Sequence, residues 1–178
     1  MLYDIHPDTE AATELGVLIA TLQDGTRKWR KGLGRVSPQA LVWQPYELSP
    51  SIGGLILHMV DVEAYWLRMF AAGEAEDLTK PETDYNARLE QYKHTWPAPP
   101  KKPLSWYYAI QDARRAEHLE YIRLQADPAE AKGKGKNQAT YRWIVAHLVE
   151  HDSYHGGQAV LLHEMFKRMR TAQSANAM

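Results

Sequence analysis

The chain has 178 residues, of which 44% are hydrophobic and 24% charged, and these values are typical of one soluble globular domain. Its 21 Lys and Arg residues are balanced by 22 Asp and Glu, for a formal net charge of -1, so it lacks the basic surplus of a nucleic-acid-binding protein. Cysteine is absent, which excludes a thiol nucleophile, a cysteine-ligated zinc site and a disulfide framework. Any thiol chemistry must therefore use a thiol from a substrate.

Neither a secretory signal nor a membrane span is expected. Residues 1–7 carry no basic start and no apolar run. Charged residues or histidines interrupt every apolar stretch before it reaches the roughly 18 residues that a span requires. We therefore expect a cytoplasmic protein that does not enter the membrane. A chain of this size can bury about two thirds of its unfolded surface, so a bound metal would be functional and would not be needed for folding.

Apolar residues recur at helical spacing in four long segments, which predicts helices over about residues 9–33, 49–72, 104–126 and 140–170. The second helix is expected to have Ser49 as its N-cap and Pro50 as its first residue, and to end at Gly73. Within it, Gly53 and Gly54 would let another backbone approach closely.

Two of the connections are long. Residues 34–49 are expected to hold a helical turn at 38–41, and the polar, proline-rich segment 73–103 is expected to be a crossover with a helical piece at 84–94. The Lys-Gly-Lys-Gly-Lys run at 132–136 is predicted to be a flexible loop, because no strand precedes it and no Walker pattern surrounds it.

No apolar/polar alternation is long enough to predict a strand. The chain is therefore predicted to be all-α, a four-helix bundle with a long crossover connection. We expect a single domain over residues 1–170, followed by a flexible tail at 171–178.

The last predicted helix carries polar residues where its inward face should be apolar. That face can be traced in steps of four and three through Ile144, Leu148, His151, His155, Gln158, Leu162, Met165 and Met169. His151 and His155 lie one turn apart, so two ring nitrogens can reach a single metal ion. His58 lies inside the apolar face of the second helix. Three inward histidines can form a metal site with positions open for water or substrate, although a core histidine is more often simply hydrogen-bonded.

The remaining histidines show no comparable pattern. His147 falls toward the edge of the inward face, and we expect it to support the site or to lie at the surface. The other four are expected to be exposed or locally bonded: His6, His94, His118 and His163.

The stretch from His151 to His155 also resembles the zincin motif H-E-x-x-H, with Asp152 at the position of the glutamate base. The shorter side chain and the bundle architecture argue against a protease. Asp152 is expected to hydrogen-bond a ligand or to face solvent.

Two segments are similar to the DinB/YfiT-like family of bacterial four-helix bundles. One is the sequence VSPQALVW at residues 36–43 followed by SIGGLILH at 51–58, and the other is HLVEHDSYHGGQ at 147–158. The resemblance implies that His58, His151 and His155 bind a divalent metal ion, most often zinc or nickel. Asp152 replaces a frequent glutamate of the family, and Gly156 replaces a frequent larger residue.

Members of that family include S-transferases that use bacillithiol or mycothiol, and a thiol-dependent isomerase. We therefore hypothesise a metal-dependent enzyme that activates a low-molecular-weight thiol, as an S-transferase, or water, as a hydrolase, and acts on a small-molecule substrate. Gln158 would orient a ligand or line the pocket and Tyr154 would assist, although both could equally be packing residues. The alternative is a non-catalytic, stress-associated metal-binding bundle, which a site without an accessible cavity would favour. The resemblance and the many aromatic residues also suggest a homodimer.

Overall fold

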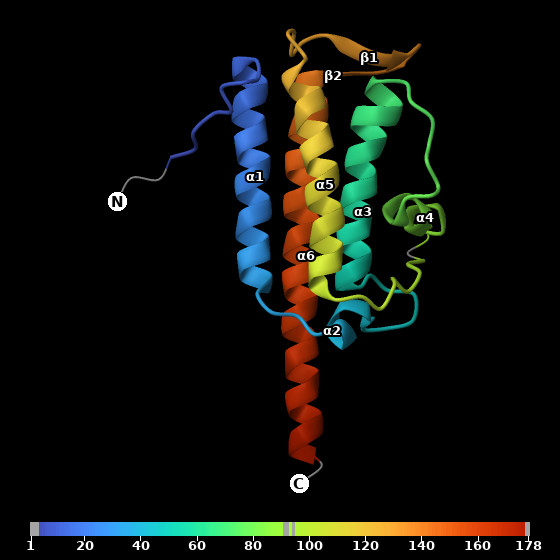
Figure 1. The fold of residues 1–178 in the computed structure, drawn as a ribbon. Coiled ribbons are helices and arrows are strands. Elements are labelled where there is room, and N and C mark those ends of the chain that lie inside the picture. The colour runs from blue at the N-terminus through green and yellow to red at the C-terminus, as the bar shows by residue number, and fades with distance from the viewer. Residues whose placement is uncertain (1–3, 91–92, 94, 177–178) are drawn as a thin grey trace.

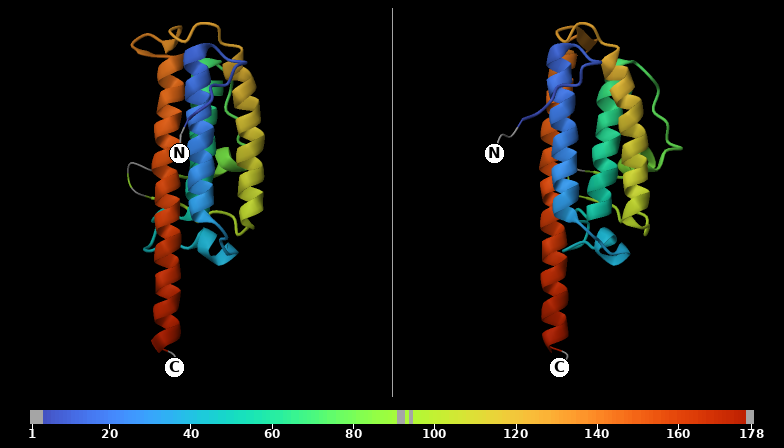
Figure 2. Two further views of the ribbon diagram at one scale, coloured as in Figure 1. Left: turned by 90° about the vertical axis from the view of Figure 1, so that its left-hand side faces the viewer. Right: turned by 60° about the vertical axis from the view of Figure 1, so that its left-hand side comes forward.

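The computed structural model describes residues 4–90, 93 and 95–176. Four long helices lie side by side in an upright bundle (Figure 1): α1 (Thr13–Leu33), α3 (Ile52–Ala64), α5 (Leu104–Arg123) and α6 (Tyr141–Asn176). Helices α6 and α5 each pack against both α1 and α3, and the views in Figure 2 show the same arrangement from two other sides. The predicted four-helix bundle is confirmed.

The directions of the helices explain the long crossover. In Figure 1, α1 and α6 run downward, whereas the neighbouring helices α3 and α5 both run upward. Parallel neighbours cannot be joined by a short turn, so the chain must return along the bundle between them. The π-helix η1 (Tyr65–Ala71) continues α3 upward, and the chain then returns through a segment that holds the short helix α4 (Pro81–Ala87), which packs against α3.

The second predicted helix is divided into two kinds of helix. The N-cap is Ser51 and not Ser49, which was predicted. Helix α3 begins at Ile52 because Ser51 Oγ accepts a hydrogen bond from the backbone N–H of Gly54 at 3.3 Å. After Ala64 the chain widens into η1, and Gly73, with a φ of 75°, follows its end. The helical turn predicted at 38–41 is present as α2 (Pro38–Val42).

The run at 132–136 is not a loop, and in this respect the sequence-based prediction was wrong. Strands β1 (Ala131–Lys134) and β2 (Asn137–Thr140) pair antiparallel and form a small hairpin across the upper end of the bundle (Figure 1). Lysine and glycine are poor strand formers, which is why the pattern of the segment gave no strand signal. Gly133 and Gly135 have φ values of 96° and 60°, a region that glycine enters at little cost.

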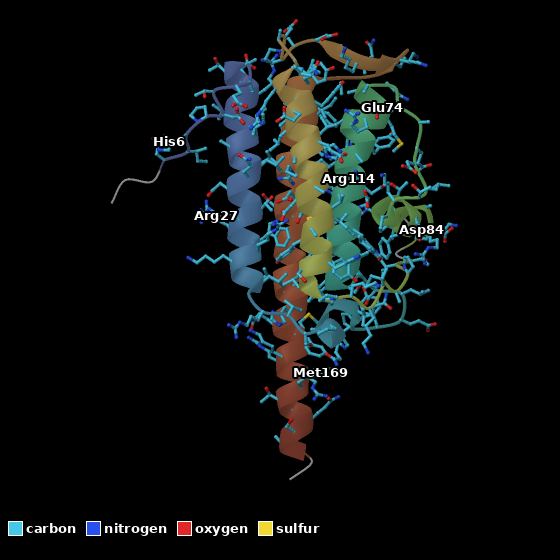
Figure 3. All side chains as sticks on the ribbon, viewed as in Figure 1. His6, Arg27, Glu74, Asp84, Arg114 and Met169 are labelled. Carbon is cyan, nitrogen blue, oxygen red and sulfur yellow. The ribbon has the colours of Figure 1, made fainter. Side chains whose placement is uncertain are left out.

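Helix α6 is longer than predicted, because it continues through Asn176 where a flexible tail was expected from residue 171. Its last turns project beyond the other helices, and Met169 lies on this projecting part (Figure 3). Among the described residues, no helix is both long and apolar enough to cross a membrane.

The core consists of two apolar clusters with a polar layer between them. One cluster includes Trp29 and Leu55, and the other includes Leu119 and Ile144. Between them along the four helices lie buried polar residues, which we call the polar layer: Thr26, Glu63, Arg115, His118 and Asp152.

Candidate metal centre

The three predicted histidines come together halfway along the bundle. One ring nitrogen of each of His58, His151 and His155 lies within 4.8 Å of the others. The ring centroid of His58 is 5.1 Å from that of His151 and 5.1 Å from that of His155, and the centroids of His151 and His155 are 4.4 Å apart. Helix α3 supplies His58, which is 2% exposed, and α6 supplies the other two. Three nitrogens at this separation can converge on one ion and leave its remaining positions open.

The buried face of α6 is rotated by about one residue from the predicted one. Its buried residues include Val145, Leu148, Asp152, Gly156, Ala159 and His163, again in steps of three and four. Met165, which we expected to face inward, is exposed. His151 therefore stands beside the core and not at its centre, and it is partly open to solvent. This position gives a ligand access to the site.

Two carboxamide side chains fix the orientation of two of the three imidazoles. The Nδ1–H of His58 donates to Asn86 Oδ1 at 2.8 Å, and the Nδ1–H of His155 donates to Gln158 Oε1 at 2.7 Å. Donation from Nδ1 leaves the lone pair of Nε2 free to bind a metal, and such partners are typical of metal-binding histidines. Gln158 thus contacts a site histidine, as a residue that orients it.

Sequence reasoning missed Asn86, which the crossover brings to the site. The preceding residue, Tyr85, packs its ring end against Gly54 of α3, where a Cβ atom would collide with its hydroxyl group. The same hydroxyl donates to the carbonyl of Pro97 at 3.0 Å. Gly54 therefore admits an aromatic side chain and not the close backbone that we expected. The only sequence signal for Asn86 was the helical piece predicted in the crossover.

Burial keeps these histidines neutral. Burial lowers the pKa of His58 to about 4, against the opposing effect of its hydrogen bond to Asn86. Burial, together with the charges of His155 and His58, lowers the pKa of His151 to about 2. Burial also lowers the pKa of His155. Near pH 7 the three rings are uncharged, which is the form that binds metal ions.

A cleft of about 660 Å³ opens beside the histidines. It runs between α3, η1, α6 and the crossover, and we call it the metal cleft; it is lined by His58, Val62, Tyr65, Trp66, Asn86, Leu89, Glu90, Lys93, His147 and His151. His147 stacks on Trp143 with ring centroids 5.1 Å apart. It lies outside the group of three histidines but borders the same cleft. The volume is sufficient for a small organic molecule.

Asp152 occupies neither of the positions expected for it. It is buried, and its Oδ2 accepts hydrogen bonds from Thr26 Oγ1 at 2.9 Å and from Trp29 Nε1 at 2.8 Å, while its Oδ1 accepts one from Arg115 at 3.2 Å. It therefore faces neither solvent nor a ligand. Consecutive residues of a helix point about 100° apart, so Asp152 points to a different side of α6 from His151. Tyr154 is 63% exposed, and its ring centroid lies 5.0 Å from that of His155 at the rim of the site.

Two of the other histidines are buried, against expectation. His118 donates from Nδ1 to Glu63 at 2.8 Å, and His163 donates from Nδ1 to the carbonyl of Leu33 at 3.0 Å. Both partners are remote in sequence, so local patterning could not reveal them. His6 is exposed, as predicted, and His94 lies outside the described residues.

The comparison with curated proteins finds no match for this chain. Residues 17–167 match the model of the mycothiol-S-transferase family, and this range includes the three histidines, Asn86 and Gln158. The match spans most of the chain and all four helices of the bundle to at least half their length. The chain therefore belongs to the mycothiol-S-transferase family, within the DinB/YfiT-like superfamily of metal-dependent four-helix bundles.

Proposed function

We propose that this protein transfers the thiol of mycothiol to a small electrophile, with a divalent metal ion held by His58, His151 and His155. The observation that carries the proposal is the geometry of three neutral imidazoles whose nitrogens lie within 4.8 Å of one another beside an open cleft. Zinc and nickel both accept such a nitrogen donor set, and either would fit the site. A divalent ion bound there would lower the pKa of the thiol and so raise the fraction of thiolate at neutral pH.

In the proposed reaction a C–S bond forms between the thiol sulfur and the electrophilic carbon. The S–H proton is released, and the leaving group departs with the electron pair of its bond. The protein's part is to hold the reactants together in the metal cleft. His58 and His155 keep a fixed orientation through Asn86 and Gln158, and this preorganisation avoids rearrangement during the reaction.

The cleft also bears on the alternatives. A non-catalytic metal-binding bundle has no need of an open space beside its metal ligands, whereas a transferase must admit two reactants. The family match gives no support to a hydrolase that activates water. Because the thiol must remain reduced, we place the reaction in the cytoplasm.

A homodimer remains part of the proposal. Leu161 and Met165 are 60% and 41% exposed on the lower half of α6, and a second copy of the chain could cover them. Light scattering across micromolar concentrations tests this point, and a monomer throughout that range would refute the dimer without affecting the metal site.

The decisive experiment measures metal content and thiol transfer on protein purified without a histidine tag. His58→Ala, His151→Ala and His155→Ala should each lose most of the bound metal and the mycothiol transfer activity. His147→Ala and His163→Ala are matched controls and should keep most of the metal. Loss of metal in His147→Ala together with its retention in His155→Ala would refute the proposed ligand set.

Circular dichroism shows whether the site is functional or structural. Because His151 and His155 stand beside the core and the chain is large enough to fold without a metal, the three variants should keep the helical spectrum of the parent. Collapse on loss of the metal would instead favour a bundle that the metal stabilises. Metal binding without any transfer from mycothiol would refute the proposed reaction while leaving the site intact.

A further inference from the structure

A second pocket, of about 530 Å³, lies between η1 and the hairpin. We call it the hairpin pocket. One wall is aromatic, and the other is formed by residues 136–140; its lining is Tyr65, Trp66, Phe70, Lys136, Asn137, Gln138, Ala139, Thr140 and Trp143. Trp143 is 48% exposed although it is a large apolar side chain. Exposed aromatic surface that lines a concave space is typical of a ligand-binding site.

The hairpin pocket adjoins the metal cleft, because Tyr65 and Trp66 line both. The ring centroid of Trp66 lies 5.1 Å from that of Trp143 and 5.4 Å from that of His147, and His147 in turn lies 5.9 Å from His151. A continuous aromatic wall thus leads from the candidate metal centre to the hairpin. A molecule bound in the hairpin pocket could present a reactive atom toward the metal cleft.

The π-helix creates the aromatic wall. Its i to i+5 hydrogen bonds place Tyr65 and Phe70 on the same side, with ring centroids 6.5 Å apart. In an α-helix these two residues would point about 140° apart. A π-helix is uncommon and occurs frequently at functional sites, which agrees with a role in shaping the pocket.

The hairpin packs directly against this wall. A Cβ atom on Gly133 would lie 2.6 Å from Phe70 Cζ, so the two segments touch without any space for a side chain. The Nζ atom of Lys132 also lies 5.2 Å from the ring centroid of Tyr141. The hairpin can therefore serve as a fixed wall of the pocket.

Lys136 sets the charge of the pocket, because it is the one charged residue among the described lining residues. We propose that the hairpin pocket binds the electrophilic substrate, and that this substrate is an aromatic compound with an anionic group. Its ring would pack against Trp66 and Trp143, and its anionic group would pair with Lys136. The assignment of the ligand as the electrophile rests on the proposed S-transferase function.

Binding is tested by calorimetry with 2-naphthoate as the probe. The neutral analogue 2-naphthalenemethanol lacks the charge, and cyclohexanecarboxylate lacks the aromatic ring, so both should bind more weakly. Lys136→Met should weaken naphthoate binding about fivefold, as expected for the loss of one partly exposed ion pair, and should leave the neutral analogue unaffected. Trp143→Leu should weaken both aromatic probes. Lys101→Met is the matched control, because Lys101 is also exposed but does not line the hairpin pocket.

Transfer kinetics test the assignment to the electrophile. With 4-(bromomethyl)benzoate, the thiol sulfur bonds to the benzylic carbon, bromide leaves with the electron pair, and the thiol proton is released. Lys136→Met should raise the KM for this compound about fivefold but should not raise the KM for mycothiol or for uncharged benzyl bromide. A rise in the KM for mycothiol alone would assign the pocket to the thiol and overturn the proposal.

The binding experiment is independent of the metal and of the reaction. The His58→Ala variant should bind naphthoate as the parent does, so an absence of transfer activity would refute the proposed function without refuting the pocket. Three results would overturn the pocket: unchanged naphthoate binding in Lys136→Met, equal binding of cyclohexanecarboxylate, or a loss of binding as self-association rises with protein concentration. The last result would assign the aromatic surface to a second copy of the chain.

Discussion

Replacing Arg115 by methionine should strongly destabilise the fold, because this residue joins the two buried carboxylates of the polar layer. Its guanidinium lies 2.9 Å from Glu63 Oε2 and 3.2 Å from Asp152 Oδ1. The side chains of Glu63 and Asp152 are only 6% and 5% exposed. Methionine would fill the volume of the arginine stem while it deprives both acids of the guanidinium charge.

The size of the effect follows from the burial. Removing one partner of a buried ion pair costs about 3–5 kcal/mol of unfolding free energy, because the remaining charge is desolvated and uncompensated. For a domain of this size each 1 kcal/mol lowers the melting temperature by about 2–4 °C, so we expect a decrease of roughly 6–20 °C at pH 7. His118 still donates to Glu63, and Trp29 and Thr26 still donate to Asp152, which favours the lower part of that range.

The loss of unfolding free energy caused by Arg115→Met should depend on pH. Burial by itself raises the pKa of Glu63, but the charge of Arg115 and the hydrogen bond from His118 outweigh it and hold this pKa below its ordinary value. In the parent, Glu63 therefore adds stability above its unfolded pKa, and this stability is lost as the pH falls through its folded pKa. Without Arg115 the pKa of Glu63 rises, so the folded variant takes up protons more readily. The deficit relative to the parent should be largest near pH 7 and smaller at about pH 5.

Urea and thermal unfolding of the parent and the variant at both pH values measure this difference. Arg27→Met is the matched control, because Arg27 pairs with Asp24 at the surface and should cost less than about 1 kcal/mol. A deficit for Arg115→Met below about 1 kcal/mol at pH 7, or one that grows toward pH 5, would refute the assignment of the polar layer as a charge-paired part of the core.

Three further substitutions test separate features of the structure. Gln158→Ala should weaken metal affinity about 10–100-fold without a change in the circular dichroism spectrum, and equal affinity in a chelator competition assay would contradict its role in orienting His155. Gly156→Val should cost roughly 1–3 kcal/mol in urea unfolding, because a Cβ atom there collides with the ring of Trp29, and Gly157→Val, which has open space, is its control. Burial raises the pKa of Asp61 from 3.8 to about 6, so the parent should lose roughly 2–3 kcal/mol as the pH rises from about 4 through 6. Asp61→Asn should remove that loss. If the unfolding free energy of the variant depends on pH as that of the parent does, the loss does not come from Asp61.

The helices and the histidine cluster could be predicted because both depend on spacing along the chain. A period near 3.6 identifies a helix from its own residues, and it also places His151 and His155 on one side of α6. His58 could be assigned to the same site because it interrupts the apolar face of the second predicted helix. The crossover followed from the composition of residues 73–103, which is too polar and too rich in proline for a core helix.

The rest depends on contacts between remote segments. Asn86 reaches His58 only because Tyr85 packs on Gly54, and no pattern within residues 81–87 indicates that contact. The hairpin is held by the packing of Gly133 against Phe70, and tertiary contact here overrides the weak strand preference of lysine and glycine. The buried ion pairs of Arg115 were likewise hidden, because a charged residue in a helix is normally assigned to its exposed face.

The rotation of α6 explains how one short segment serves both the core and the site. A residue and its neighbour point about 100° apart on a helix, so Asp152 can enter the polar layer while His151 and His155 belong to the candidate metal centre. Gly156 then lies on the buried side and admits Trp29, whose indole N–H donates to Asp152 at 2.8 Å. The anchoring of the helix and the binding of a ligand thus fall on different side chains of the same two turns. For this reason exchange of His151 or His155 should leave the fold stable, whereas exchange of Asp152 or Gly156 should destabilise it, although none of these residues lies more than five positions from any other.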